Sequence, residues 1–183
     1  MSKIVAIVSS PRASGQGIAI VNKMVDTAKA AGNDVETFYI NKLEDLKGCQ
    51  ACMGCKKKPG KCIRKDSLTP VLDAVAEADS LILSTPDYFG QPCGQYRMFE
   101  DRLYGFIDGT FALQIKPKKV AVVVTCGAGV DGAKAIADTM AGVMTNYMKS
   151  DVVGQIVYSE KENGAFAENA AFQSEAEAIA KKL

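Results

Sequence analysis

Five short apolar runs alternate with longer stretches in which apolar residues recur at spacings of three and four. The runs are rich in Val and Ile and are mostly uninterrupted by polar residues, which is typical of strands buried on both faces of a parallel sheet. The predicted strands are Lys3–Val8, Asp34–Tyr39, Ser80–Ser84, Lys119–Thr125 and Val152–Tyr158.

The stretches that follow the strands predict amphipathic helices, because a spacing of three and four places apolar residues on one helical face. In the second helix Ser67 is the expected N-cap, and Pro70 falls in the first turn, where its missing N–H does little harm. The apolar positions that mark the five helices are Ile18, Val21, Val25 and Ala28; Leu68, Val71, Leu72 and Val75; Tyr96, Phe99, Leu103 and Phe106; Val130, Ala133, Ile136, Ala137, Met140 and Met144; and Phe172, Ala176, Ile179 and Leu183.

Repeated strand–helix units predict an α/β fold, a parallel sheet covered by helices on both faces. Five strands favour the flavodoxin-like three-layer sandwich with strand order 2-1-3-4-5, in which a ligand lies beyond the carboxyl ends of the strands. No linker or internal repeat divides the chain, so we expect a single domain over residues 1–183. One connection, at about 41–66, is unusually long and rich in cysteine, and connections of this length are often functional.

Composition narrows the class of protein. The 22 basic and 21 acidic residues sum to +1, which gives no support for a nucleic-acid or membrane partner. The first residues lack the features of a signal peptide, and no apolar run reaches the roughly 20 residues that span a bilayer, so a cytoplasmic location with reduced thiols is expected. The absence of histidine removes the commonest general base and zinc ligand.

The loop after the first strand has the composition of a phosphate-binding turn. Unpaired N–H groups at a helix N-terminus attract phosphate, hydroxyl and guanidinium groups add donors, and glycines allow close approach. A plain strand-to-helix turn with a serine cap is the alternative at this point. The candidate phosphate-binding residues are Ser10, Arg12, Ser14, Gly15, Gln16 and Gly17.

The loop after the third strand carries more specific motifs. It reads Pro86-Asp87-Tyr88-Phe89-Gly90, followed by Gly94-Gln95 and Phe99-Glu100-Asp101-Arg102. Together with Ser10-Pro11-Arg12, these motifs resemble those of the NADPH-dependent FMN reductase family within the flavodoxin-like superfamily, and in particular its iron–sulfur flavoproteins. The resemblance extends in order over nearly the whole chain.

The resemblance implies bound flavin mononucleotide (FMN), with its phosphate on the first loop. The flavin ring would lie against the third loop and the loop after the fourth strand, where apolar walls and backbone groups suit a flat ring with a polar edge. The residues implied are Pro86, Asp87, Tyr88, Phe89 and Gly90, with Thr125, Cys126 and Gly127.

Three positions depart from the family pattern. Gly15-Gln16-Gly17 stands where Gly-Asn-Thr or Gly-Asn-Ser is usual, which removes a hydroxyl that Ser14 could replace. Asp87 stands where an apolar residue is favoured, and a carboxylate facing the ring would lower the flavin potential. Cys93 stands where Ser is usual. Cys93 and Cys126 could both border the flavin, and the interpretation favoured here is that they are two small buried residues.

Four cysteines in the long connection form the pattern C-x2-C-x2-C-x6-C, at Cys49, Cys52, Cys55 and Cys62. A compact run of thiolates is typical of a [4Fe–4S] cluster, and the iron–sulfur flavoproteins carry such a motif after the second strand. Two alternatives stay open, a structural zinc site and free thiols without a metal. The lysines around the motif could balance a negatively charged cluster, form a solvated loop or attract an anionic electron carrier.

The sequence therefore predicts an FMN-dependent oxidoreductase or electron-transfer flavoprotein, with no identifiable catalytic acid or base. With a cluster, a ferredoxin-like carrier is the expected electron donor. Without one, NAD(P)H would stack transiently on the flavin and reduce it, and a quinone, free flavin or metal ion would accept the electrons. A non-enzymatic metal-binding or docking module is a further alternative. The resemblance also implies a homodimer or homotetramer, with the cysteine loop near a neighbouring subunit.

Overall fold

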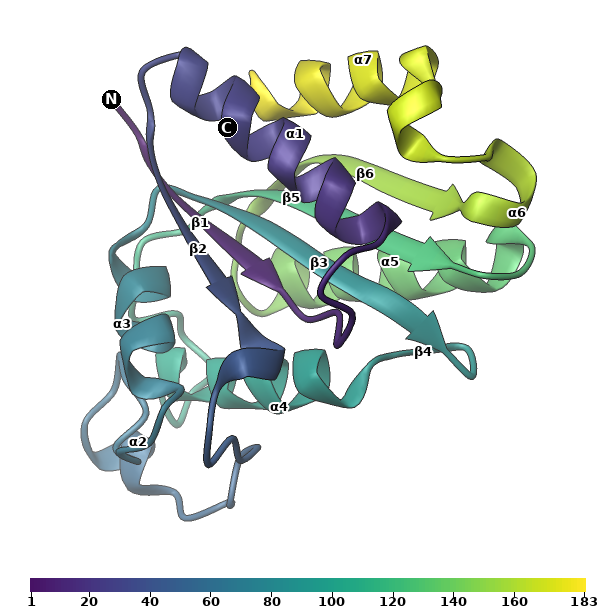
Figure 1. Cartoon of the computed structure of the whole chain (residues 1–183). Coiled ribbons are helices and arrows are strands. Elements are labelled where there is room, and N and C mark those ends of the chain that lie inside the picture. Colours follow the sequence, from purple (N-terminus) through teal and green to yellow (C-terminus); the bar gives the residue numbers. More distant parts are fainter.

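A sheet of five parallel strands runs through the middle of the molecule, with helices on both faces (Figure 1). The structure is a computed structural model that describes residues 1–183. The strand order is β2-β1-β3-β5-β6, which confirms the predicted flavodoxin-like arrangement. The strands are β1 (Lys3–Val8), β2 (Asp34–Tyr39), β3 (Ser80–Tyr88), β5 (Lys119–Cys126) and β6 (Asp151–Ser159). A two-residue strand, β4 (Gln91–Pro92), pairs antiparallel with the end of β3.

Each central strand is buried on both faces, so its side chains alternate between two hydrophobic cores. In β1, Ile4 and Ala6 pack toward α1 (Gln16–Ala30) and α7 (Ala170–Ala180). Val5 and Ile7 pack on the opposite face. That face is covered by α3 (Thr69–Glu77), α4 (Gly94–Arg102) and α5 (Val130–Asn146) (Figure 1). The short elements are η1 (Ile40–Lys42), α2 (Gly54–Lys57), η2 (Leu103–Phe106), α6 (Glu160–Asn163) and η3 (Phe166–Glu168).

The start of α3 differs from the sequence prediction. Ser67 is not the cap, because its hydroxyl donates to the Glu44 carbonyl instead. The carboxylate of Asp66 accepts the Leu68 N–H at 3.1 Å, and the hydroxyl of Thr69 accepts the Asp66 N–H at 3.0 Å. Leu68 is the N-cap of α3, with no capping side chain, and Asp66 instead bonds the backbone of the turn that leads into the helix.

Two other elements have different lengths from those predicted. β3 continues four residues beyond Ser84 and turns back at Phe89 and Gly90, which have φ of 56° and 72°. Two consecutive positive φ angles in a two-residue connection suit the right-handed twist of the hairpin formed with β4. The helix predicted through Phe106 ends at Arg102, and the chain continues as the 3₁₀ helix η2.

The cysteine-rich connection packs against the end of α4 and against η2. A Cβ at Gly105 in η2 would lie 2.7 Å from the backbone nitrogen of Cys62, so only glycine allows the two backbones to approach so closely. In Figure 1 this connection and α2 extend below the sheet, away from α1 and α7. None of the helices combines the length and apolar character needed to cross a membrane.

Candidate functional site

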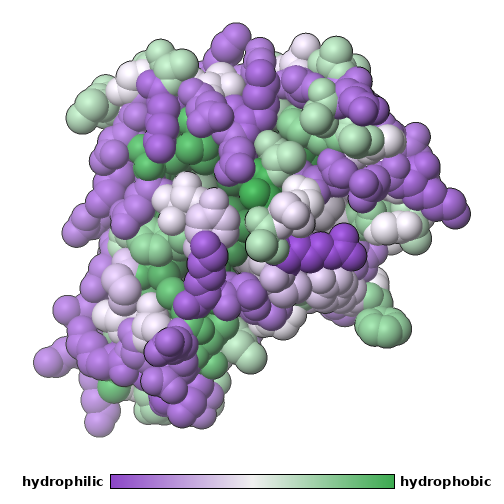
Figure 2. Space-filling view, in the orientation of Figure 1, coloured by the Kyte–Doolittle hydropathy of each residue, from purple (hydrophilic) through white to green (hydrophobic).

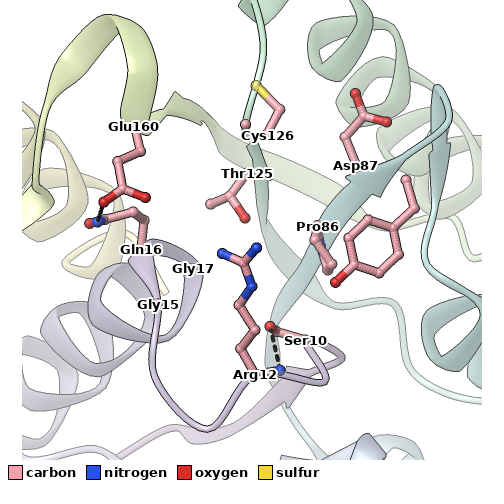
Figure 3. Close-up of a pocket in the computed structure, with 12 residues that line it drawn as sticks. Ser10, Arg12, Gly15, Gln16, Gly17, Pro86, Asp87, Thr125, Cys126 and Glu160 are labelled. Carbon is pink, nitrogen blue, oxygen red and sulfur yellow. Dashed lines mark hydrogen bonds between the residues drawn. The ribbon is translucent and has the colours of Figure 1, made fainter.

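A pocket opens at the carboxyl ends of β1, β3 and β5, where the sequence predicts the ligand (Figure 3). Three loops that are far apart in the sequence meet there. Eleven of the fourteen predicted cofactor-binding residues line this pocket, while Ser14, Phe89 and Gly90 do not. The lining residues are Ser10, Arg12, Gly15, Gln16, Gly17, Pro86, Asp87, Tyr88, Thr125, Cys126, Gly127 and Glu160.

The wall built by the β1–α1 loop has the features of a phosphate cradle. The first turn of α1 begins at Gln16 and presents its N-terminus to the pocket. A Cβ at Gly17 would lie 3.3 Å from Thr125 Oγ1 and 3.5 Å from Ser84 Oγ, so the absence of a side chain keeps this wall open. Arg12 is the one cationic side chain among the lining residues, and its guanidinium points toward Thr125 (Figure 3). A helix N-terminus, a close backbone and one guanidinium fit a phosphate group.

Gln16 lines the pocket, and its side chain also joins two segments of the chain. Its side-chain amide donates to Glu160 Oε1 at 2.8 Å, and its side-chain oxygen accepts the Phe166 N–H at 2.8 Å. The side chain therefore ties the start of α1 to the segment after β6, and its amide is already committed to protein partners.

Glu160 was not among the residues predicted from the sequence. It is the first residue after β6, at the carboxyl end of the outermost strand, and it reaches the pocket through its contact with Gln16 (Figure 3). Its position directly after a strand of the parallel sheet is the signal that could have identified it.

The β3–β4 hairpin forms the opposite wall, on the side of Asp87 and Pro86 (Figure 3). The Asp87 carboxylate accepts the Gly90 N–H at 2.8 Å and so holds the turn. Tyr88 lines the pocket, whereas Phe89 sits at the tip of the turn with its side chain fully exposed. In Figure 2 hydrophobic atoms project from this hairpin. Only one of the two predicted aromatic residues thus belongs to the pocket wall.

The two cysteines outside the long connection occupy different environments. Cys126 lines the pocket, and burial raises the pKa of its thiol, which keeps it protonated. Cys93 is 1% exposed and does not line the pocket. Its thiol donates to the Ser9 carbonyl at 3.2 Å, so the interpretation of Cys93 as a small buried residue fits the structure.

The four cysteines of the long connection line a second pocket, which is mostly apolar. Cys49 and Cys52 are exposed, Cys55 is buried and Cys62 is half-buried. No set of three or more Cys, Asp or Glu side chains is arranged for metal binding. Four thiols around one apolar hollow have the donor chemistry of a [4Fe–4S] site, in which each thiolate binds a different iron and the sulfurs do not meet at a single ion.

Comparison with known proteins decides the family. The sequence model of the NADPH-dependent FMN reductase family matches residues 2–164. The chain belongs to this family. That confirms the resemblance drawn from the Ser-Pro-Arg and Pro-x-Tyr-Phe-Gly motifs.

Curated proteins with sequence similarity to this chain include iron–sulfur flavoproteins. One from Archaeoglobus fulgidus is 30% identical over 132 residues, which is 72% of this chain and 63% of that protein. Another, from Methanocaldococcus jannaschii, is 34% identical over 101 residues, which is 55% of this chain and 51% of that protein. The match thus spans between half and two thirds of the length of these relatives.

Solved structures confirm the flavodoxin-like fold of this FMN reductase family member. An NADH:FMN oxidoreductase in its apo form has a TM-score of 0.72 at 16% identity, covering 100% of this chain and 88% of that one. An azoreductase from Bacillus anthracis has a TM-score of 0.71 at 18% identity, covering 100% of both chains. At these identities the likeness establishes the fold alone.

Proposed function

We propose that this chain is an FMN-dependent oxidoreductase that passes electrons between FMN and a [4Fe–4S] cluster held by its cysteine loop. The observation that carries the proposal is the meeting of three loops in one pocket at the carboxyl ends of β1, β3 and β5. Membership of the FMN reductase family and the similarity to iron–sulfur flavoproteins support it.

In this proposal the β1–α1 loop binds the phosphate of FMN. The N–H groups of the first turn of α1 and the Arg12 guanidinium donate to the phosphate oxygens, while Gly17 leaves room for them. Thr125 and Gly127 form the floor, and Tyr88 with Pro86 provides an apolar side for the flavin ring. FMN supplies the chemistry, accepting electrons singly or as a hydride, and the protein supplies binding and orientation.

Two carboxylates, those of Asp87 and Glu160, are among the side chains that line the pocket. A carboxylate near a reduced anionic flavin opposes its negative charge, so these residues favour a low reduction potential. The Gln16 side-chain amide is bonded to Glu160, so in this proposal Gln16 contacts the phosphate through its backbone N–H.

The cluster assignment rests on the donor set. Cys49, Cys52, Cys55 and Cys62 line one apolar pocket, and the curated relatives carry the name iron–sulfur flavoprotein. We propose a ferredoxin-like one-electron carrier as the donor and a homodimer or homotetramer as the assembly.

A second candidate is a cluster-free NAD(P)H-dependent FMN or quinone reductase. The observation that favours it is the absence of three converging ligands in the cysteine loop. In that case a nicotinamide would stack on the flavin from the open side of the pocket, and the thiols would be free.

Titration of the apoprotein with FMN and riboflavin tests the flavin site. The phosphate cradle predicts tight FMN binding and much weaker riboflavin binding. Arg12→Ala should weaken FMN binding by roughly 1–3 kcal/mol through loss of a charge-assisted hydrogen bond. Lys29→Ala, at the exposed far end of the same helix, is the matched control and should bind FMN like the wild type. Equal affinity for the two flavins would contradict the proposal that the β1–α1 loop binds the phosphate.

Iron and acid-labile sulfide per chain, measured after anaerobic purification, separate the two candidates. Replacing any one of the four loop cysteines with Ser should reduce the iron content while FMN stays bound, because the two pockets share no residue. Cys93→Ser should leave iron unchanged. A protein that holds FMN but no iron, even after reconstitution, would favour the cluster-free reductase.

A further inference from the structure

Arg102 is an arginine buried at the end of α4, with its side chain 1% exposed. Its guanidinium donates to the Asp66 carboxylate at 2.7 and 3.3 Å and to the Lys47 carbonyl at 3.0 Å. Its Nε donates to the sulfur of Cys62 at 3.2 Å. A buried guanidinium with four of its five N–H groups bonded is held in one orientation, so this N–H···S contact is built into the fold.

Cys62 is distinct from the other three cysteines of its pocket. It alone accepts a hydrogen bond from a protein N–H, and its backbone packs directly on Gly105. The neighbouring cations point elsewhere. Arg64 pairs with Asp66 at 3.1 Å and contacts no sulfur, and Lys56 donates to the Tyr104 and Ile107 carbonyls.

We propose that Arg102 is a positioning residue. It holds Cys62 in place as a ligand of the cluster and raises the reduction potential of the cluster bound there. This inference rests on the proposed function. The electron added on reduction increases the negative charge on the iron and its thiolate sulfurs, and a fixed guanidinium beside one sulfur stabilises that charge. Burial strengthens the effect because solvent screens it little. One electron is taken up, and no bond or proton changes place.

Substitutions on the two sides of the ion pair give effects of opposite sign. Arg102→Gln removes the cation and the N–H donor from Cys62, so the midpoint potential should fall. Asp66→Asn keeps an acceptor for the Leu68 N–H but removes the negative charge that offsets Arg102, so the potential should rise. Arg102→Lys keeps the charge without the fork of donors and should lie between Arg102→Gln and the wild type.

Arg64→Gln is the matched control. It removes one positive charge from the same pocket and from the same carboxylate, but no hydrogen bond to sulfur. Because the Arg64 side chain is 33% exposed, its charge is better screened and the shift should be much smaller than for Arg102→Gln.

The experiment is a redox titration of the FMN-loaded, anaerobically reconstituted protein, followed by electron paramagnetic resonance. At a fixed potential we expect the ratio of reduced to oxidised cluster to fall about tenfold in Arg102→Gln, which corresponds to about 59 mV for one electron. FMN content reports that each variant is folded. If Arg102→Gln does not fold, the upward shift in Asp66→Asn carries the test.

The outcomes separate this inference from the proposed function. A wild-type protein with FMN and a cluster, in which neither Arg102→Gln nor Asp66→Asn moves the potential beyond the Arg64→Gln control, overturns the role of Arg102 alone. A wild-type protein that takes up no iron overturns both the cluster assignment and the role of Arg102.

Discussion

At the scale of single residues, one buried carboxyl group gives the stability of this protein a defined dependence on pH. Glu100 lies on α4 with 7% of its surface exposed. Burial raises the pKa of its carboxyl group, and the nearby Asp101 acts in the same direction. The ion pair with Arg97 opposes this shift and does not cancel it. The folded protein therefore holds a proton on Glu100 more tightly than the unfolded chain does.

This difference has a defined consequence for stability. Just above pH 4.5, the ordinary pKa of a glutamate, the folded state binds more protons at this site than the unfolded state. The site therefore lowers the free energy of unfolding as the pH rises through that window. Glu100→Gln should make the slope of unfolding free energy against pH less negative than in the wild type, measured by urea denaturation between pH 4.5 and 6.5.

Arg97→Gln supplies the control of opposite sign. It removes the cation that holds the Glu100 pKa down, so the slope should become more negative. Identical slopes in the wild type and both variants would show that Glu100 does not titrate differently in the two states.

At the scale of elements, the cysteine loop depends on the close approach of two backbones. A methyl group at Gly105 would lie 2.7 Å from the Cys62 nitrogen and 3.0 Å from its Cα. Backbone atoms cannot rotate away as a flexible side chain can, so η2 and the loop would have to separate. The packing of the loop is thus set by one position in a different element, some forty residues further along the chain.

Gly105→Ala should lower the free energy of unfolding by about 1–3 kcal/mol and speed proteolysis within the cysteine loop. Gly109→Ala is the matched control, since a Cβ there meets no atom within 4 Å, and it should change stability by less than about 0.5 kcal/mol. Urea denaturation and limited proteolysis of both variants make the test. Equal protection of the loop in the two variants would contradict the contact.

The difference between local sequence patterns and contacts of distant segments explains how much of the molecule could be predicted from its sequence. Strand positions followed from local hydrophobicity, because β1, β3 and β5 are buried on both faces and must be apolar throughout. The strand order followed from the five repeated strand–helix units. Three loops met in one pocket because parallel strands end at one edge of the sheet. These features depend on periodicity and topology, which a single sequence contains.

Features that depend on contacts between distant segments were missed. Gln16 and Glu160 are 144 positions apart, and nothing local indicates that one amide is bonded to the other. Asp66, and not Ser67, bonds the backbone just before α3, and it also pairs with Arg102, 36 positions away. The four thiols were correctly expected in one region, yet their spacing does not specify how the sulfurs are oriented.

At the scale of the whole molecule, charge is strongly segregated although the chain is nearly neutral. Residues 46–65 contain seven of the 22 basic residues and none of the 21 acidic ones, so the rest of the chain carries a net charge of −6. In this segment Met53 and Ile63 are also exposed, at 52% and 44%. Figure 2 shows hydrophobic atoms among hydrophilic ones in the region of α2. Apolar contacts within a charged rim are typical of protein–protein interfaces.

One consequence concerns assembly. The basic segment and the acidic remainder of a second copy are electrostatically complementary, which fits the proposed homodimer or homotetramer. Light scattering of the FMN-loaded protein should give a multiple of 19.5 kDa. The multiple should decrease as salt is raised, because screening weakens contacts between exposed charges. A strictly monomeric and active protein would contradict this.

The other consequence concerns the electron donor. Because electrostatic attraction speeds the encounter of oppositely charged proteins, reduction by an acidic ferredoxin should be fast at low salt and fall steeply with ionic strength. Lys57 and Lys58 are exposed on and next to α2, and replacing both with Glu should slow this reduction about tenfold or more at low salt.

The matched control replaces Lys29 and Lys181 with Glu, which changes the net charge equally. These two residues lie on α1 and beside α7, across the sheet from the cysteine loop (Figure 1). The measurement is stopped-flow reduction of the protein by dithionite-reduced ferredoxin at several salt concentrations. Docking at the cysteine loop requires that the first pair of substitutions slows reduction far more than the second. Equal slowing by both pairs would mean that net charge alone determines the rate. A rate independent of salt would contradict an acidic electron donor.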